Sequence, residues 1–115
     1  MIDSPRARPS YGGQHRDFLS QAALDPESRE VVSDDIQEQT RQTLRNLEGV
    51  LKEAGATFAN VVNMRVCLRD ESDFQKFNIA FSDFMQGEKV TRTCVGGRPH
   101  RSGVNVEIDC IAMFD

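Results

Sequence analysis

The end of the chain alternates strictly between two kinds of residue, and this pattern allows few folds. A strand places successive side chains on opposite faces, so each face can be assigned from the sequence. One face of the strand predicted at 104–114 is wholly apolar and holds Val104, Val106, Ile108, Cys110 and Ala112. The other face is mixed and holds Asn105, Glu107, Asp109, Ile111 and Met113. The pattern predicts a strand with one face packed on a core.

Three further segments are predicted to be extended. In 61–68, Val62, Met64, Val66 and Leu68 point one way, and Asn63, Arg65 and Cys67 point the other. Residues 90–96 form another predicted strand. Near the start, an apolar run at 17–23 and the segment 30–32 flank the turn Asp25-Pro26-Glu27-Ser28, which predicts a hairpin.

Two segments have helical periodicity. Ser33, Asp34 and Asp35 are typical N-cap residues, the apolar positions that follow recur at steps near 3.6, and Gly55 ends the pattern. The second helix follows the polar run 70–73. Its apolar stripe, predicted to lie in the core, holds Phe74, Phe77, Phe81 and Phe84.

The predicted order is β-β-α-β-α-β-β, an α+β fold with one sheet and two helices on one of its faces. The opposite face is then left uncovered. We predict that it carries Arg65, Cys67, Arg92, Cys94, Glu107 and Asp109 beside Ile111 and Met113. Because this face is too apolar for water and too charged for a dry core, we expect self-association, with charged clefts between subunits.

The length of 115 residues fits a single domain. We place this domain at 17–115, after an arm at 1–16 that has no clear periodicity. A net charge of −4 and a pI near 5.1 argue against nucleic acid as the main partner. No apolar run is long enough for a membrane span or a secretory signal, so a cytoplasmic protein is expected. The Arg-rich start leaves mitochondrial import open.

The cysteines and histidines do not form a metal-binding pattern. Cys67, Cys94 and Cys110 lie in separate strand-like runs without a C-x-x-C pair, and we expect them to be reduced. His15 and His100 are far apart in the sequence, so no metal site is predicted.

Two segments together resemble the signature of the RidA/YjgF family of imine deaminases. Arg92-Thr-Cys-Val precedes Val106-Glu-Ile-Asp-Cys-Ile-Ala at the spacing that the family shows between R-[ST]-x-V and V-E-I-E-A-I-A. Weaker matches are Tyr11 after Pro9-Ser10, Ser20-Gln21 with Leu24-Asp25-Pro26, Asn60-Val61-Val62, and Ser72-Asp73-Phe74 with Asn78. The resemblance implies a chorismate-mutase-like fold and a homotrimer with active sites in the clefts between subunits.

The activity that the resemblance implies is hydrolysis of 2-aminoacrylate and related imino acids to 2-keto acids and ammonia, without a cofactor. By matched position, Arg92 would bind the substrate carboxylate, which suits its planar fork of donors. Glu107 would position or deprotonate the attacking water. Cys94 would line the site through its backbone, and further pocket positions would be Tyr11, Ser20 and Asn78.

The residues by themselves leave other interpretations open. Arg92 and Glu107 could form a cross-strand ion pair, Cys94 could be a small apolar filler, and Asn78 could be a surface amide. At the level of function, the alternatives are a non-catalytic trimer that binds small carboxylates and an RNA-cleaving inhibitor of translation. Negative charge and a single Tyr argue against the second.

The chain departs from the family pattern in three places. The first hairpin is shorter than usual and lacks the Gly of a Ser-Gly-Gln turn, so the placement of Tyr11 and Ser20 is affected. Residues 96–101 replace the usual Leu-Pro pair with Gly-Gly-Arg-Pro-His-Arg, which predicts a pocket of different width. Arg65 stands where Thr is common, so an extra positive charge is expected inside the trimer.

Overall fold

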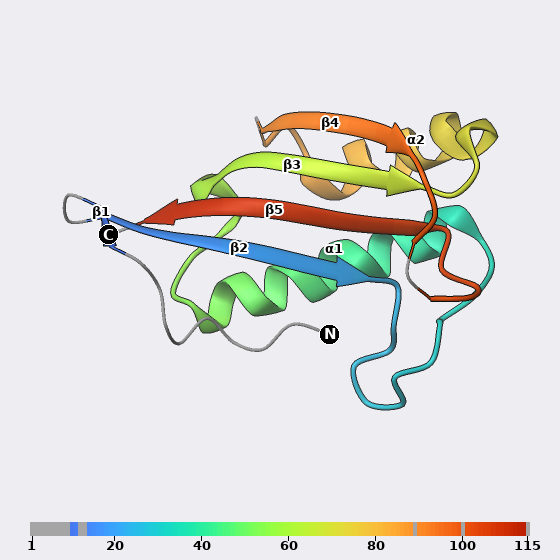
Figure 1. Ribbon diagram of the computed structural model, residues 1–115, viewed down its shortest axis with the longest axis horizontal. Coiled ribbons are helices and arrows are strands. Elements are labelled where there is room, and N and C mark those ends of the chain that lie inside the picture. Colours follow the sequence, from blue (N-terminus) through green and yellow to red (C-terminus); the bar gives the residue numbers. More distant parts are fainter. Residues whose placement is uncertain (1–9, 12–13, 89, 100, 115) are drawn as a thin grey trace.

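The structure is a computed structural model that describes residues 10–11, 14–88, 90–99 and 101–114. Five strands form one mixed sheet in the order β1-β2-β5-β3-β4 (Figure 1). The strands are β1 (Ser10–Tyr11), β2 (Gln14–Ala22), β3 (Val61–Leu68), β4 (Thr91–Gly96) and β5 (Val106–Phe114). Only β3 and β4 run parallel. Strands β1 and β2 begin inside the range expected to be an arm, and residues 1–9 lie outside the described residues.

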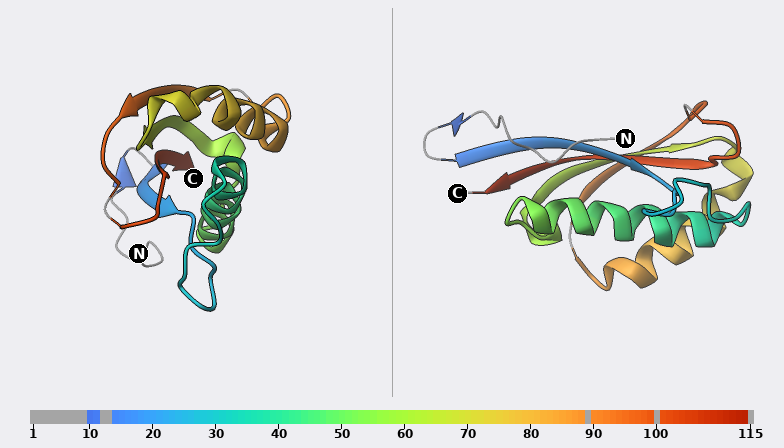
Figure 2. Two further views of the ribbon diagram at one scale, coloured as in Figure 1. Left: turned by 90° about the vertical axis from the view of Figure 1, so that its right-hand side faces the viewer. Right: turned by 90° about the horizontal axis from the view of Figure 1, so that it is seen from below.

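Both helices lie on one face of the sheet, as the sequence predicts (Figure 2). They are α1 (Ile36–Glu53) and α2 (Phe74–Met85), and each follows a short 3₁₀ turn or loop that fixes its start. The Asp35 carboxylate caps α1 by accepting from the Glu38 backbone N–H at 2.9 Å. Gly55 leaves the helix at a φ of +81°, a conformation that glycine adopts without strain.

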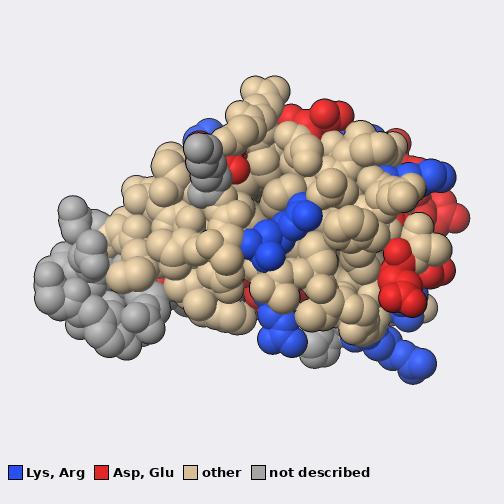
Figure 3. Space-filling view, turned by 90° about the horizontal axis from the view of Figure 1, so that it is seen from above, with Lys and Arg blue, Asp and Glu red and all other residues tan. Residues whose placement is uncertain are grey.

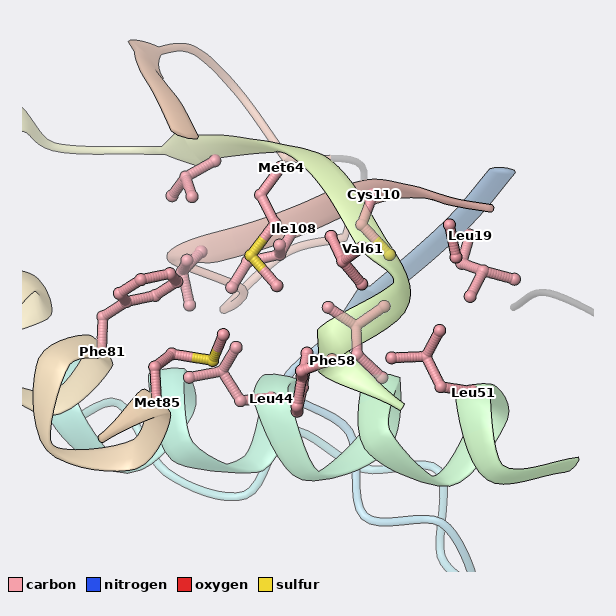
Figure 4. Packing of buried hydrophobic residues seen from close by; sticks show 14 of the residues in the cluster. Leu19, Leu44, Leu51, Phe58, Val61, Met64, Phe81, Met85, Ile108 and Cys110 are labelled. Carbon is pink, nitrogen blue, oxygen red and sulfur yellow. The ribbon is translucent and has the colours of Figure 1, made fainter. Parts of the chain in front are cut away.

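The core fills the space between the helices and the sheet (Figure 4). The predicted apolar face of β5 is confirmed, because Val104, Val106, Ile108, Cys110 and Ala112 are all 0 or 1% exposed. Leu44, Leu47 and Leu51 of α1 pack against this face. Three polar residues of α1, namely Gln39, Thr40 and Thr43, are also fully buried.

The assignment of side chains in β3 is wrong at its start. Val61 is buried and Val62 is 48% exposed, the reverse of the prediction for Val62. The pairing of β3 with β5 shifts between Val61 and Asn63, which marks a β-bulge. A bulge adds one residue to a strand and reverses the faces before it. From Met64 to Leu68 the predicted alternation is confirmed.

The hairpin predicted around Asp25 is confirmed only next to its turn. Leu24 and Val31 form an antiparallel bridge, and backbone hydrogen bonds join Asp25 to Glu30 and Val32 to Ala23. The rest of the predicted first strand belongs to β2, which pairs instead with β1 and β5. The predicted turn itself is present, because the Asp25 carboxylate accepts from the backbone N–H groups of Glu27 and Ser28 at 2.9 and 3.0 Å. These bonds lower the pKa of the Asp25 carboxyl.

Candidate functional site between two faces of the sheet

The open face of the sheet carries polar side chains in rows that cross the strands. Ser20, Asp109, Arg65 and Thr93 share one row, and Ala22, Glu107, Cys67 and Val95 share the next. The Ser20 hydroxyl donates to the Asp109 carboxylate at 2.6 Å. Glu107 and Asp109 are both partly exposed. Among the predicted site residues, Glu107 and Ser20 are therefore neighbours on this face.

Arg92 does not lie on the open face, so this prediction is wrong. It is paired in register with Met64, whose side chain is fully buried on the helix side. Paired residues of neighbouring strands point to the same side of a sheet. The Arg92 guanidinium carbon lies 4.7, 5.6 and 5.9 Å from the ring centres of Phe81, Phe77 and Phe74. An arginine side chain has an apolar stem, and its guanidinium group is attracted to the faces of aromatic rings. It can therefore occupy a covered face of a sheet.

The stripe of Phe residues is therefore only partly core. Phe77 and Phe81 are buried, but Phe74 is 39% exposed and Phe84 is half-buried. The Phe84 ring meets the Phe58 ring edge to face, with 6.1 Å between the ring centres. The other three rings contact Arg92 and form one continuous row.

Cys94 also lies on the helix side, and its predicted place on the open face is wrong. It is paired with the fully buried Val66 and packs against the core, which supports the filler interpretation. Burial raises the pKa of the Cys94 thiol, and the nearby Arg92 charge opposes this only in part. At neutral pH the thiol is protonated, so it is a poor nucleophile.

Arg92 and Glu107 do not meet within one chain. Strand β3 separates β4 from β5, so the two backbones are roughly 10 Å apart, and the side chains leave opposite faces. The interpretation of these residues as a cross-strand ion pair is therefore wrong.

The remaining predicted residues are placed as follows. Asn78 is partly buried on α2, four residues after Phe74 and three before Phe81, and residues at these steps are neighbours on a helix surface. It is therefore next to the rings that contact Arg92. Tyr11 pairs with Gln14 at the start of the sheet, and its side chain lies outside the described residues. Arg65 is exposed on the open face.

The segment that departs from the family pattern forms one wall of an open pocket. Its volume is about 590 Å³, and its lining residues are Arg69, Asp70, Glu71, Gly96, Gly97 and Arg98. A Cβ at Gly97 would lie 2.9 Å from the Cys67 Sγ, so a larger residue there would displace the Cys67 side chain. The cavity lies at the end of β4 opposite to Arg92, and none of the predicted site residues lines it.

Among the described residues, no group of three or more His, Cys, Asp or Glu side chains is placed to hold a metal ion. Within the same residues, no helix is both long and apolar enough to cross a membrane. Seen from the β4 edge of the sheet, the molecule has basic side chains in the middle of a largely uncharged surface, and most of the acidic side chains lie toward one end (Figure 3).

Comparisons with known proteins show the family of this chain. Residues 18–114 match the family described as Endoribonuclease L-PSP, the RidA/YjgF or RutC family. The chain belongs to this family. A RutC family protein of Pyrococcus abyssi is 37% identical over 92 residues, which cover 80% of this chain and 72% of that protein. The mouse protein named 2-iminobutanoate/2-iminopropanoate deaminase is 37% identical over 93 residues, or 81% of this chain and 69% of the relative.

The fold of this RidA/YjgF family member is also found among solved structures. E. coli TdcF, solved with bound serine, superposes on this chain with a TM-score of 0.81 at 24% identity. The superposition covers 100% of this chain and 91% of TdcF. At this identity the likeness supports the fold alone. The α+β architecture with a mixed sheet and two helices is thus confirmed.

Two features of the site were not predicted from the sequence. The hydrogen bond from Ser20 to Asp109 depends on the pairing of β2 with β5, which only the fold reveals. The contact of Arg92 with three Phe rings depends on β4 lying over α2. The spacing of Phe74, Phe77 and Phe81 indicates a continuous row of rings, but nothing in the sequence indicates that a cation lies on it.

Proposed function

We propose that this protein hydrolyses 2-imino acids and their enamine tautomers to 2-keto acids and ammonia, as a homotrimer with sites between its subunits. The observation that carries the proposal is the state of Arg92. Its guanidinium is partly buried, yet it donates no hydrogen bond to any residue that the structure describes. A partly buried cation with unused donors is suited to an anionic ligand. Membership of a family with relatives named as imine deaminases supports an imino acid as the source of this carboxylate.

Two other arginines of the chain, Arg69 and Arg101, differ from Arg92 in this respect. Arg69 donates from Nε to the Val104 carbonyl at 3.1 Å, and Arg101 donates to the Arg29 carbonyl at 2.7 Å and to Glu30 at 3.0 Å. These two side chains hold loops together. Arg92 has no such bond to the residues that the structure describes, and this supports its role as the carboxylate anchor.

The proposed site requires a second copy of the chain. Arg92 and Glu107 point away from opposite faces of one sheet. Both can therefore face one cleft only if they come from different subunits, for example where the edge of one sheet lies against the face of another. The open face offers the contact surface, because Phe18 there is 61% exposed beside Ile111. Burial of such an apolar side chain favours association.

The chemistry that we propose needs one anchor and one base. Arg92 binds the carboxylate with two parallel hydrogen bonds and holds the adjacent imine carbon in place. Glu107 accepts a proton from water as the water oxygen bonds to that carbon, and it passes this proton to the imine nitrogen. The resulting carbinolamine loses ammonia as the C–N bond breaks, its hydroxyl proton moves to the nitrogen through Glu107, and a keto group forms. The reaction consumes one water and requires no cofactor.

Four other residues would complete the pocket. β4 is the last strand of the described sheet, so one edge of its backbone is not paired with another strand and could bind substrate near Cys94. Asn78 is next to the rings under Arg92, and the Ser20 hydroxyl is one row from Glu107. Tyr11 is proposed from the family signature only.

A coupled assay tests this function against its alternatives. An amino-acid oxidase generates the imine in place, and ammonia release is timed with and without the protein. We expect faster release at micromolar protein. Unchanged release together with binding of pyruvate, the 2-keto acid product from alanine, would instead support a non-catalytic carboxylate binder. Cleavage of single-stranded RNA that persists in an Arg92→Ala variant would support the ribonuclease alternative.

A further inference from the structure

Three aromatic rings of a single helix lie against the Arg92 guanidinium. Phe74, Phe77 and Phe81 recur at steps of three and four residues on α2, so their side chains stack along one side of that helix. The ring centres of Phe74 and Phe77 are 6.4 Å apart, and those of Phe77 and Phe81 are 5.5 Å apart. We call these three rings the aromatic cradle.

The cradle is anchored in the core at one end and open at the other. Phe77 is fully buried and Phe81 is 7% exposed, whereas Phe74 is 39% exposed. The two buried rings cannot easily change their positions because packed interiors hold side chains in single rotamers. The platform under the Arg92 guanidinium is therefore formed before any ligand binds.

All three rings lie within the distance at which a cation is attracted to an aromatic face. The limit for this attraction is about 6 Å from the ring centre, and the Arg92 guanidinium carbon lies 4.7 to 5.9 Å from the three centres. The shortest distance is to Phe81. This ring is therefore expected to contribute most.

Rings hold a guanidinium in a way that carboxylates cannot. A salt bridge would fix Arg92 but would use its N–H donors and neutralise its charge. A ring contacts the flat face of the guanidinium and leaves the N–H groups, which lie in the guanidinium plane, free to bind a ligand. The cradle thus fixes the cation without competing for its ligand.

We propose that the aromatic cradle is the positioning device of the carboxylate site, and that Phe81 is its main positioning residue. The proposal rests on the proposed function, in which Arg92 binds the substrate carboxylate. Phe81 acts through Arg92, and loss of its ring lets the guanidinium leave the geometry needed for two parallel hydrogen bonds. The consequence is weaker carboxylate binding with little change in the chemical step.

A double-mutant cycle between Phe81 and Arg92 tests this role. Pyruvate is the probe, and its dissociation constant is measured by calorimetry beside KM and kcat. We expect Phe81→Leu to weaken pyruvate binding and raise KM about 2- to 30-fold, the range of a cation–ring contact, while kcat changes less. Phe81→Tyr keeps the ring and should restore binding. In an Arg92→Ala background, Phe81→Leu should have no further effect.

The same helix supplies a matched control. Phe84 is replaced by Leu in the same way, but its ring contacts Phe58 and not Arg92. Equal loss of pyruvate binding in Phe84→Leu and Phe81→Leu would overturn the proposal, because the loss would then reflect helix packing. Equal loss from Phe81→Leu with and without Arg92 would overturn it as well.

Two provisions keep the test decisive. If Phe81→Leu does not fold, Phe74→Leu removes the most exposed ring of the cradle, and the same cycle and outcomes apply. If the parent protein binds pyruvate but does not accelerate ammonia release, the proposed function fails, while the binding cycle still decides whether the cradle positions Arg92.

Discussion

The two faces of the sheet are built from alternate residues of the same strands, yet they differ in burial and in polarity. On β5, Val106, Ile108 and Cys110 are sealed under the helices, while Glu107 and Asp109 between them remain partly exposed. The covered face holds its structure by apolar packing, and the open face holds hydrogen-bonding and charged groups. Neighbouring residues of one strand therefore have different roles: one packs in the core, and the next carries a polar group on the open face.

Strand β4 breaks this division. Arg92 and Cys94 lie on the covered face, and both are only partly buried because β4 is the last strand of the described sheet. Here the covered face also carries a charge, supported by rings in place of acidic partners. The comparison indicates that a site using Arg92 and Glu107 must combine one group from each face, and hence more than one subunit.

The largest effect is expected from a charge placed on the open face. Phe18→Asp should prevent assembly, because an aspartate would then have to be buried without a partner. Light scattering should give about three times the 12.9 kDa chain mass for the parent and a single chain mass for the variant. Ile79→Asp is the matched control, since Ile79 is 56% exposed on α2 and lies on the other side of the molecule. A parent protein that is monomeric at micromolar concentration would contradict the site between subunits.

The second effect concerns the open face as the source of the base. Glu107→Gln keeps the shape of the side chain but cannot accept a proton, so kcat should fall about 10²- to 10⁴-fold. Asp109→Asn should cost less than about tenfold, because Asp109 is expected to act only by holding the Ser20 hydroxyl. Steady-state kinetics of both variants decide between them. Equal losses of kcat in the two variants would contradict the role of Glu107 as the general base.

The third effect concerns the covered face as the source of the anchor. Arg92→Lys keeps the charge but loses the planar fork, so kcat/KM should fall by about 1 to 3 kcal/mol in free energy, and Arg92→Ala should fall further. Arg65→Lys is the same change on the open face and should leave kcat/KM within about twofold, the effect of an exposed charge. If Arg65→Lys has the larger effect, the carboxylate is bound on the open face.

The regular parts of the molecule were predictable because one force decides them. Strict alternation in β5 and helical periodicity in α1 both record burial of apolar side chains, and the structure confirms both patterns. The predicted face of Val62 is wrong, because a bulge depends on the pairing of β3 with β5. Near Asp25 the predicted hairpin is reduced to one bridge, because turn residues do not require long flanking strands.

Polar residues inside the fold were the least predictable. Gln39 is fully buried because its amide donates to the carbonyls of Ser33 and Gly103 and accepts from the Asn105 backbone N–H. These partners lie in distant segments, so no local pattern announces them. Arg92 was misplaced for the same reason, since polarity alone suggested the open face and only the fold brings the aromatic cradle under it.

The smallest effect is expected at Cys94. Its thiol is packed against the core with a raised pKa, so it is not a nucleophile at neutral pH, and Cys94→Ala should retain most of the parent kcat and KM. The backbone near Cys94, which we propose contacts the substrate, is kept in this variant.

The thiols give a second measurement. Burial raises the pKa of the Cys110 thiol to about 12, so Cys110 should be alkylated more slowly than the half-buried Cys94. Substrate protection of Cys94 from alkylation, together with loss of turnover in an intact Cys94→Ala trimer, would point to covalent catalysis. The covered face would then supply the nucleophile as well as the anchor, and the division of roles between the two faces would fail.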